Sequence, residues 1–150
     1  MGTKHRGPAR EVRALNAFIA LVRASESVNA RLQPLLDRAN LTVSQFGALE
    51  ALRHLGPLRP REIGEKLLKS GGNVTMVVAN LERRGLVRRV RTPDRRTFSV
   101  RLTPAGGRLI RRIFPRHVAG VVRDFAVLSP SQQEEMRRLC KALGTQRRPS

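Results

Sequence analysis

The chain has 150 residues, and its 30 lysines and arginines against 11 aspartates and glutamates give a formal net charge of +19. A charge of this size carries self-repulsion, which indicates a polyanionic partner; nucleic acid is favoured, and an anionic membrane surface is the rival. No run approaches the roughly 18 apolar residues of a membrane-spanning helix. Five Phe without any Trp or Tyr argue against readers that stack single-stranded or RNA bases on aromatic side chains.

Residues 1–9 are basic and contain Pro8, so we expect a disordered arm that orders only against an anion. One domain should follow over residues 10–145, with residues 146–150 as a loose basic tail. Over residues 10–37 apolar side chains recur at helical spacing, which predicts a long helix that Pro34 kinks or splits. This apolar stripe is longer than a three-helix core requires, so part of it is expected to face another subunit.

Two shorter helices are expected next. Thr42 and Gln45 form a capping box that starts the first of them, and Gly56 followed by Pro57 stops it. The second opens at Pro60 and has Arg59 at its cap position, where Ser, Thr or Asp would cap better. Arg59 is therefore either a cation offered to a phosphate or simply a poor cap.

A third helix, which we call the reading helix, begins at about Gly72 and has two distinct faces. Its apolar side chains follow the spacing i, i+3, i+4, i+7: Val74, Val77, Val78 and Leu81. The opposite face and its flanks carry small, amide, hydroxyl and cationic groups: Gly72, Asn73, Thr75, Met76, Ala79, Asn80 and Arg83. A face so poor in carboxylates can enter a DNA major groove and hydrogen-bond base edges. Taken alone, the pattern fits an ordinary amphipathic helix with a solvated back equally well.

Gly85 is expected to end the reading helix in the left-handed conformation, with Leu86 returning to Leu81. Residues 86–91 and 97–102 then alternate as the two strands of a hairpin. The loop between them projects two adjacent arginines, Arg95 and Arg96, beside the reading helix. Arginines at a hairpin tip are usually only solvated, but this position favours contact with DNA.

Two further helices complete the chain. Thr103 and Pro104 start a long helix to about residue 125, which Pro115 should bend. Residues 129–132 form another capping start, for a last helix whose apolar side chains are Met136, Leu139, Cys140 and Leu143. Cys140 is expected to be a buried packing residue, and as the lone cysteine it excludes an internal disulfide. Catalysis is disfavoured, because Cys140 with His117 is the only nucleophile–base pair and no third group orients the base.

Five segments of the chain resemble the MarR (multiple antibiotic resistance regulator) family. They are residues 41–46 (LTVSQF), 61–67 (REIGEKL), 80–87 (NLERRGLV), 94–96 (DRR) and 102–106 (LTPAG), within a similarity that covers residues 11–143. Residues 70–75 (SGGNVT) are similar to the branch that responds to phenolic or quinone compounds. The resemblance implies a mainly α-helical fold with a small β-hairpin wing. It places a winged helix-turn-helix over residues 41–103 and long dimerisation helices over residues 10–37 and 104–144.

The resemblance also implies a homodimeric, sequence-specific repressor of transcription that works on double-stranded DNA in the cytoplasm. Two reading helices would enter successive major grooves of a pseudo-palindrome. The residues implied on or beside each are Ser70, Gly72, Asn73, Thr75, Met76, Asn80 and Arg83. Arg95 or Arg96 would enter the minor groove, and Asp94 would brace the wing by pairing with a nearby arginine. Phosphate contacts are expected from Arg59, Arg61 and Lys69.

The family resemblance further implies a small phenolic or anionic effector in the cleft between the dimerisation helices and the winged domain. Phe18, Val22, Phe46 and His54 are candidates to line that cleft, although the same positions fit plain core, which is favoured. Redox-sensing members place a reactive cysteine in the first helix, whereas residues 1–40 contain none. The three histidines lie far apart without carboxylates at ligand spacing, so no metal or other cofactor is expected. The alternative function is that of a sequence-independent architectural protein that binds DNA or RNA.

Overall fold

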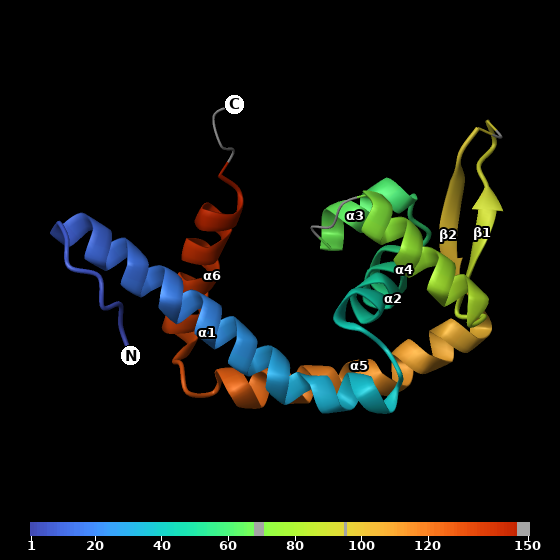
Figure 1. The fold of residues 1–150 in the computed structure, drawn as a ribbon. Coiled ribbons are helices and arrows are strands. Elements are labelled where there is room, and N and C mark those ends of the chain that lie inside the picture. Colours follow the sequence, from blue (N-terminus) through green and yellow to red (C-terminus); the bar gives the residue numbers. More distant parts are fainter. Residues whose placement is uncertain (68–70, 95, 147–150) are drawn as a thin grey trace.

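The computed structural model describes residues 1–67, 71–94 and 96–146, whose helices and hairpin are drawn in Figure 1. The helices are α1 (Ala9–Arg38), α2 (Val43–Leu55), α3 (Pro60–Leu67), α4 (Gly71–Arg83), α5 (Pro104–Phe125) and α6 (Pro130–Gly144). The strands β1 (Val87–Arg91) and β2 (Phe98–Leu102) pair antiparallel, with Val87 opposite Leu102. The predicted fold, mainly α-helical with a hairpin wing, is confirmed.

The helices form two lobes that stand apart, and α5 runs beneath both of them (Figure 1). We call residues 41–103 the winged lobe; they contain α2, α3, α4 and the hairpin. We call α1, α6 and the C-terminal half of α5 the helical arm. The two helices α1 and α5 approach closely at Gly120, because a Cβ at that position would lie only 2.8 Å from Cδ2 of Leu32.

The hydrophobic core lies in the winged lobe, where α2, α4 and the hairpin meet α5. Its most deeply buried large side chains are Leu49, Ile63, Val78, Leu81, Val87, Val100 and Ile110. The predicted capping box holds the start of α2: the Gln45 amide donates to Thr42 Oγ1 at 3.1 Å, and the Thr42 amide donates to Gln45 Oε1 at 3.0 Å. Gly56, with a φ of 76°, ends α2 as expected.

The helix α1 is continuous through Pro34, so of the two predicted outcomes the split is wrong, while a kink at Pro34 stays a prediction. Pro34 is exposed, and so is Ala30, the residue whose carbonyl loses its helical donor; water can satisfy that carbonyl. The residues before α1 lie against its first turns, where the Thr3 amide donates to Asn16 Oδ1 at 2.7 Å. The looseness of this N-terminal arm stays a prediction.

Leu86 joins three elements of the winged lobe through its backbone. Its amide donates to the carbonyl of Leu81 at 2.9 Å, and Gly85, with a φ of 72°, completes the Schellman closure of α4 that the sequence predicts. The carbonyl of Leu86 accepts the amide of Thr103 at 3.1 Å, directly before α5. Gly106 in the first turn of α5 faces the same carbonyl so closely that a Cβ there would overlap it. The end of α4, the start of β1 and the start of α5 therefore form one joint.

The last helix, α6, begins at the predicted capping box of Ser129 and Gln132 but buries no residue against the rest of the chain. Leu139 and Leu143 are more than half exposed, and Cys140 is exposed as well. The prediction that Cys140 is buried is therefore wrong for the single chain. The apolar stripe of α6 is present, but it has no counterpart within the described residues.

Candidate DNA interface

The helix α4 is fixed in the winged lobe by the apolar stripe that the sequence predicts. Val74, Val78 and Leu81 are almost completely buried, and Val77 packs partly against the same core. Because these positions face inward, the residues between them must face outward. The resulting outer surface is held rigidly by the core behind it.

Most of the predicted reading residues lie on that outer surface. Asn73, Thr75 and Arg83 are exposed, and Met76 is 73% exposed although it is apolar. Gly72 lies in the first turn of α4, while Ser70 and Lys69 fall outside the described residues. An exposed face with amide, hydroxyl, thioether and guanidinium groups, and no acid in its first turn, can hydrogen-bond base edges.

Asn80 is the exception among the predicted reading residues. It is half-buried, and its Oδ1 accepts a hydrogen bond from Nε2 of Gln45 at 2.9 Å. The side chain therefore ties α4 to α2, and we leave it out of the base-reading set. The position of Asn80 on the flank of α4 could not show whether its side chain reads bases or ties α4 to α2, because Gln45 lies 35 residues away in the sequence.

The hairpin is braced against α4 and against the loop before α3. Arg89 on β1 reaches Glu82 on α4 with 3.3 Å between Nε and Oε1, and its guanidinium lies 4.7 Å from the centre of the Phe98 ring. Leu58 adds an isolated bridge to Val100, with backbone hydrogen bonds of 3.0 and 2.7 Å. Neither brace was predicted from the sequence, because each joins segments that only the fold brings together.

The tip of the hairpin is ordered by Asp94. Its Oδ1 accepts from the Thr92 hydroxyl at 2.7 Å and from the Arg96 amide at 3.2 Å. The Thr92 bond, and after it the Arg96 bond, holds the pKa of the Asp94 carboxyl below its ordinary value. Asp94 thus braces the wing through a hydroxyl and a backbone amide, whereas the sequence predicted a guanidinium partner. Arg95 lies outside the described residues. Arg96 is exposed at the tip.

At the start of α3, Glu62 supplies the cap that Arg59 cannot. Oε2 of Glu62 accepts the Arg59 amide at 2.7 Å, which is one half of a capping box. The glutamate three residues after the cap position was the sequence signal for this bond. The Arg59 side chain is exposed, and Arg61 is also exposed, with its Nε 3.5 Å from Oε1 of Glu65. An exposed pair of this kind is weak, so both arginines can turn to phosphates.

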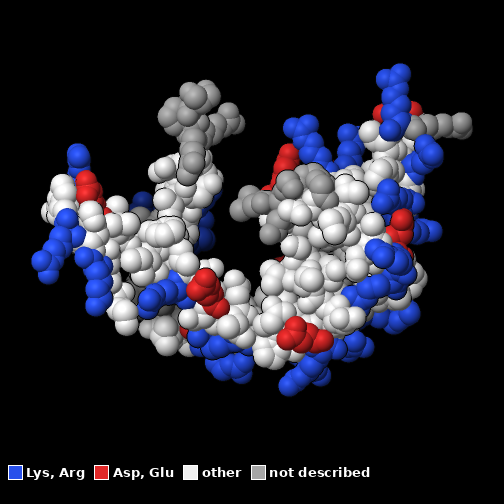
Figure 2. Space-filling view, in the orientation of Figure 1, with Lys and Arg blue, Asp and Glu red and all other residues white. Residues whose placement is uncertain are grey.

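The charge distribution agrees with these positions. Figure 2 shows Lys and Arg side chains over the hairpin and along the outer rim of the winged lobe, with few Asp or Glu side chains among them. Among the described residues no group of His, Cys, Asp and Glu could hold a metal ion. None of the described helices is both long enough and apolar enough to span a bilayer.

The four residues predicted to line an effector cleft differ in burial within the single chain. Phe46 is buried in the core and its ring is tilted against that of His117, with ring centres 4.6 Å apart. Phe18 and Val22 lie on the exposed side of α1, and His54 is exposed at the end of α2. Plain core is therefore correct for Phe46 and wrong for the other three. Sequence analysis instead missed a hollow of about 350 Å³ between α2 and α3, lined by Gly47, Glu50, Ala51, His54, Leu55, Lys66 and Leu67.

An exposed helix face fixed by a buried stripe, beside a hairpin braced to that helix and tipped by arginine, defines a winged helix-turn-helix protein that binds double-stranded DNA. The sequence profile of the MarR family matches residues 39–96. The transcriptional regulator MhqR of Bacillus subtilis is 34% identical over 133 residues, which are 88% of this chain and 92% of MhqR. The chain belongs to the MarR family of transcriptional regulators, a non-enzymatic family.

Solved structures agree with this assignment. Sco3205, a MarR family regulator from Streptomyces coelicolor crystallised in complex with DNA, is 25% identical with a TM-score of 0.85. The match covers 99% of this chain and 95% of Sco3205. BpsR of Bordetella bronchiseptica, whose DNA binding is regulated by 6-hydroxynicotinic acid, is 26% identical with a TM-score of 0.78. It covers 85% of this chain and 92% of BpsR.

Proposed function

We propose that the chain is a homodimeric repressor that binds a pseudo-palindromic operator and releases it when a small aromatic acid binds. The observation that carries this proposal is the exposed face of α4 beside the arginine-tipped hairpin. Asn73 can pair bidentately with adenine in the major groove. In this proposal Arg96 enters the minor groove, whose narrow stretches concentrate negative potential. In this proposal the repressor works at the nucleoid in the cytoplasm.

Homodimerisation is supported by the apolar side chains that the helical arm leaves in water. They come from all three of its helices: Phe18, Leu21, Val22, Val118, Val122, Leu139 and Leu143. Phe18 is 62% and Val122 is 63% exposed, and a monomer with such a surface would be poorly soluble. A two-fold axis through the arms would present two copies of α4 to one face of a duplex, as two half-sites about one helical turn apart require.

For the effector we propose the hollow between α2 and α3. Ala51, Leu55 and Leu67 offer apolar contacts for an aromatic ring, while Lys66 can hold a carboxylate. BpsR, which responds to 6-hydroxynicotinic acid, supports an aromatic acid as the chemical class. A ligand that favours one spacing of the two winged lobes would shift the equilibrium away from the DNA-binding arrangement.

The experiment that tests base reading is selection of duplexes from a randomised pool, followed by binding with variants. Asn73→Ala should cost about 1–3 kcal/mol at one base position and leave binding to random DNA unchanged. Arg96→Ala should weaken binding to every sequence and reduce the dependence of log K on log salt by about 0.9 for each phosphate that the variant no longer neutralises. Equal weakening on selected and random duplexes for Asn73→Ala would remove it from the base-reading set. A pool that yields no preferred sequence would favour the architectural alternative.

The test of dimerisation uses two exposed apolar residues of equal exposure. Leu139 on α6 and Val43 at the start of α2 are each 52% exposed. Leu139→Glu should convert the dimer to a monomer in sedimentation equilibrium, because it places a charge in the proposed interface. Val43→Glu, in the winged lobe, should leave the dimer intact. A monomeric wild-type chain, or dissociation by Val43→Glu alone, contradicts the proposed interface.

A further inference from the structure

The outer face of α5 carries a row of arginines that the proposed operator contact does not use. Arg108, Arg112 and Arg116 follow one another at intervals of four residues, so they lie on one side of the helix, and all three are exposed. The buried residue Ile110 lies about 160° around the helix axis from Arg112 and faces the core, while the buried Ile113 lies beside the row, about 60° from Arg116. Figure 2 shows the corresponding basic rim along the lower edge of the molecule, beneath α5 in Figure 1.

A hollow of about 140 Å³ deepens this basic face where α5 meets the end of α1. It is lined by Leu35, Arg38, Ala39, Arg112, Ile113 and Arg116. Three arginine residues and three apolar residues thus line one hollow, which has room for a phosphate group. An apolar lining lowers the local dielectric and so strengthens the attraction of arginine for an anion.

The described residues provide no ion pair for Arg38, Arg108, Arg112 or Arg116. Asp124 is the only acidic residue within α5, and it pairs with Arg31 at 3.1 Å. Like charges four residues apart repel each other along a helix, and no other carboxylate within α5 offsets them.

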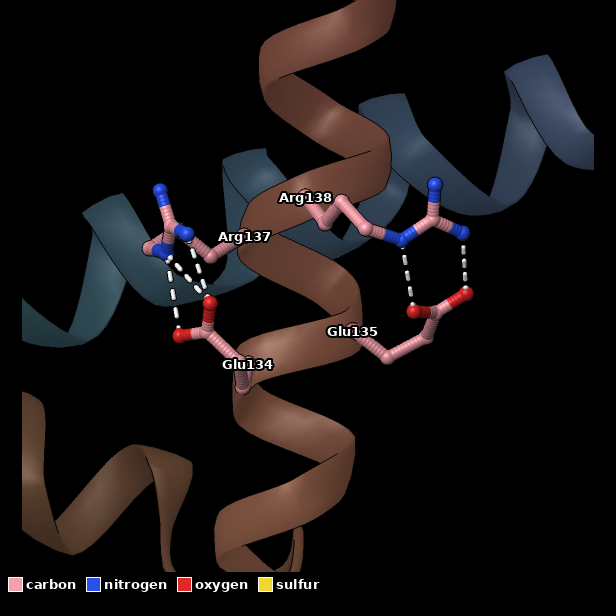
Figure 3. Close-up of polar contacts among 4 residues, drawn as sticks. All are labelled: Glu134, Glu135, Arg137 and Arg138. Carbon is pink, nitrogen blue, oxygen red and sulfur yellow. Dashed lines mark hydrogen bonds and ion pairs between the residues drawn. The ribbon is translucent and has the colours of Figure 1, made fainter.

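The helix α6 shows that the chain neutralises exposed arginines elsewhere. Glu134 pairs with Arg137 and Glu135 pairs with Arg138, each at 2.6 Å and three residues apart (Figure 3). These hydrogen bonds lower the pKa values of the two carboxylates and raise those of the two arginines. The row on α5 has no such partners among the described residues, and its regular spacing and the hollow beside it distinguish it from the chain's other unpaired arginines.

The basic face of α5 lies away from both surfaces already proposed. The helix α2 packs against α4 on one side and against α5 on the other, so a duplex seated on α4 does not reach the outer side of α5. The exposed apolar residues of α5, Val118 and Val122, lie about 80° to 160° around the helix axis from Arg112 and Arg116. Dimerisation through the helical arm thus leaves Arg112 and Arg116 accessible.

We propose that the outer face of α5, together with Arg38, binds the phosphate backbone of a second DNA duplex, so that one dimer bridges two duplexes. From Arg108 to Arg116 the row spans about 12 Å. Over that length a duplex presents about seven phosphates, enough to engage every guanidinium in the row. Recognition is by charge and is independent of base sequence, because no group on this face is placed to enter a groove.

The test is energy transfer between a donor-labelled duplex selected from the randomised pool and an acceptor-labelled random duplex, mixed with the dimer at low salt. The wild type should bring the two together. The triple variant Arg38→Gln, Arg112→Gln and Arg116→Gln should bind the selected duplex within about twofold of wild type but require at least about tenfold more protein for energy transfer. For binding of the second duplex, the dependence of log K on log salt should become shallower by about 2.7 per protomer, or about 0.9 for each phosphate that is no longer neutralised.

The matched control removes three positive charges from the helical arm, with Arg13→Gln, Arg23→Gln and Lys141→Gln. These side chains are exposed and carry no ion pair among the described residues, so they test net charge alone. Sedimentation checks that both triple variants remain dimers. Full bridging by the α5 variant, equally impaired bridging by the control, or no bridging by the wild type would overturn the proposal. A pool that yields no preferred duplex refutes the proposed operator binding instead, and bridging is then measured between two random duplexes.

Discussion

Two adjacent glycines at the start of α5 should respond in opposite directions to the same substitution. A methyl group at Gly106 would overlap the carbonyl oxygen of Leu86 and lie 2.9 Å from its carbonyl carbon and 3.3 Å from Cδ2 of Leu102. A backbone carbonyl cannot rotate away as a side chain can, so α5 or β1 must move. At Gly107 the nearest atom to the added methyl is a nitrogen of Arg111 at 3.7 Å, which is an ordinary contact with a flexible side chain.

The magnitudes follow from the bonds at this joint. Moving α5 away from Leu86 strains two hydrogen bonds, from the Thr103 amide to Leu86 and from the Thr103 hydroxyl to Gly85, and each contributes about 1 kcal/mol. Overpacking adds about 1–3 kcal/mol, while the better helix propensity of alanine returns about 1 kcal/mol. We therefore expect Gly106→Ala to lower the free energy of unfolding by about 2–4 kcal/mol. Gly107→Ala should raise it by about 0.5–1 kcal/mol.

Urea denaturation followed by circular dichroism measures both variants, at one fixed protein concentration because dimerisation would contribute to stability. The two midpoints should move to opposite sides of the wild type. If Gly106→Ala matched Gly107→Ala in stability, the close packing of α5 on the Leu86 carbonyl would be refuted.

Two smaller predictions concern residues whose roles the structure redefines. Asn80→Ala should lower the unfolding free energy by about 1 kcal/mol, because it leaves the Gln45 amide without its partner, and should not change base preference in duplex selection. The pKa of Asp94 is lowered in the folded chain, first by the hydrogen bond from Thr92 and then by that from Arg96. The stabilisation of the fold by the Asp94 carboxylate is therefore complete above the unfolded pKa of about 3.9. That contribution disappears only as pH falls through the lower folded value. In an NMR titration the Arg96 amide should shift below about pH 3.9 and stay constant above it, and Asp94→Asn should abolish that transition.

The features that the sequence predicted correctly are those decided within a few residues. The capping boxes at Thr42 and at Ser129 need only a partner three residues ahead. The Schellman closure at Gly85 depends on a left-handed glycine and the five residues before it. The inward stripe of α4 follows from helical periodicity alone, so the outward position of Asn73 was predictable too.

The features that sequence analysis missed depend on residues distant in the chain. The Gln45 side chain donates a hydrogen bond to Asn80, 35 residues further along the chain, and Arg84 donates to the carbonyls of Ala39 and Asn40 after the end of α1. Periodicity also identified the apolar side of α6 without indicating what covers it, which is why Cys140 was placed in a core. Among the residues that the structure describes, one chain supplies no cover for that side.

The joint at Leu86 bears on how an effector could release DNA. The amide of Leu86 closes α4, the residue itself leads into β1, and its carbonyl holds the start of α5. Leu86 is also buried, so these bonds are shielded from water and the three elements move together. In the proposed dimer, a shift of α5 relative to α5 of the second copy would therefore carry the reading helix and the wing as one rigid body. Asn73 and Arg96 would then leave the DNA in the same step, since neither element can retain its groove while the other moves away.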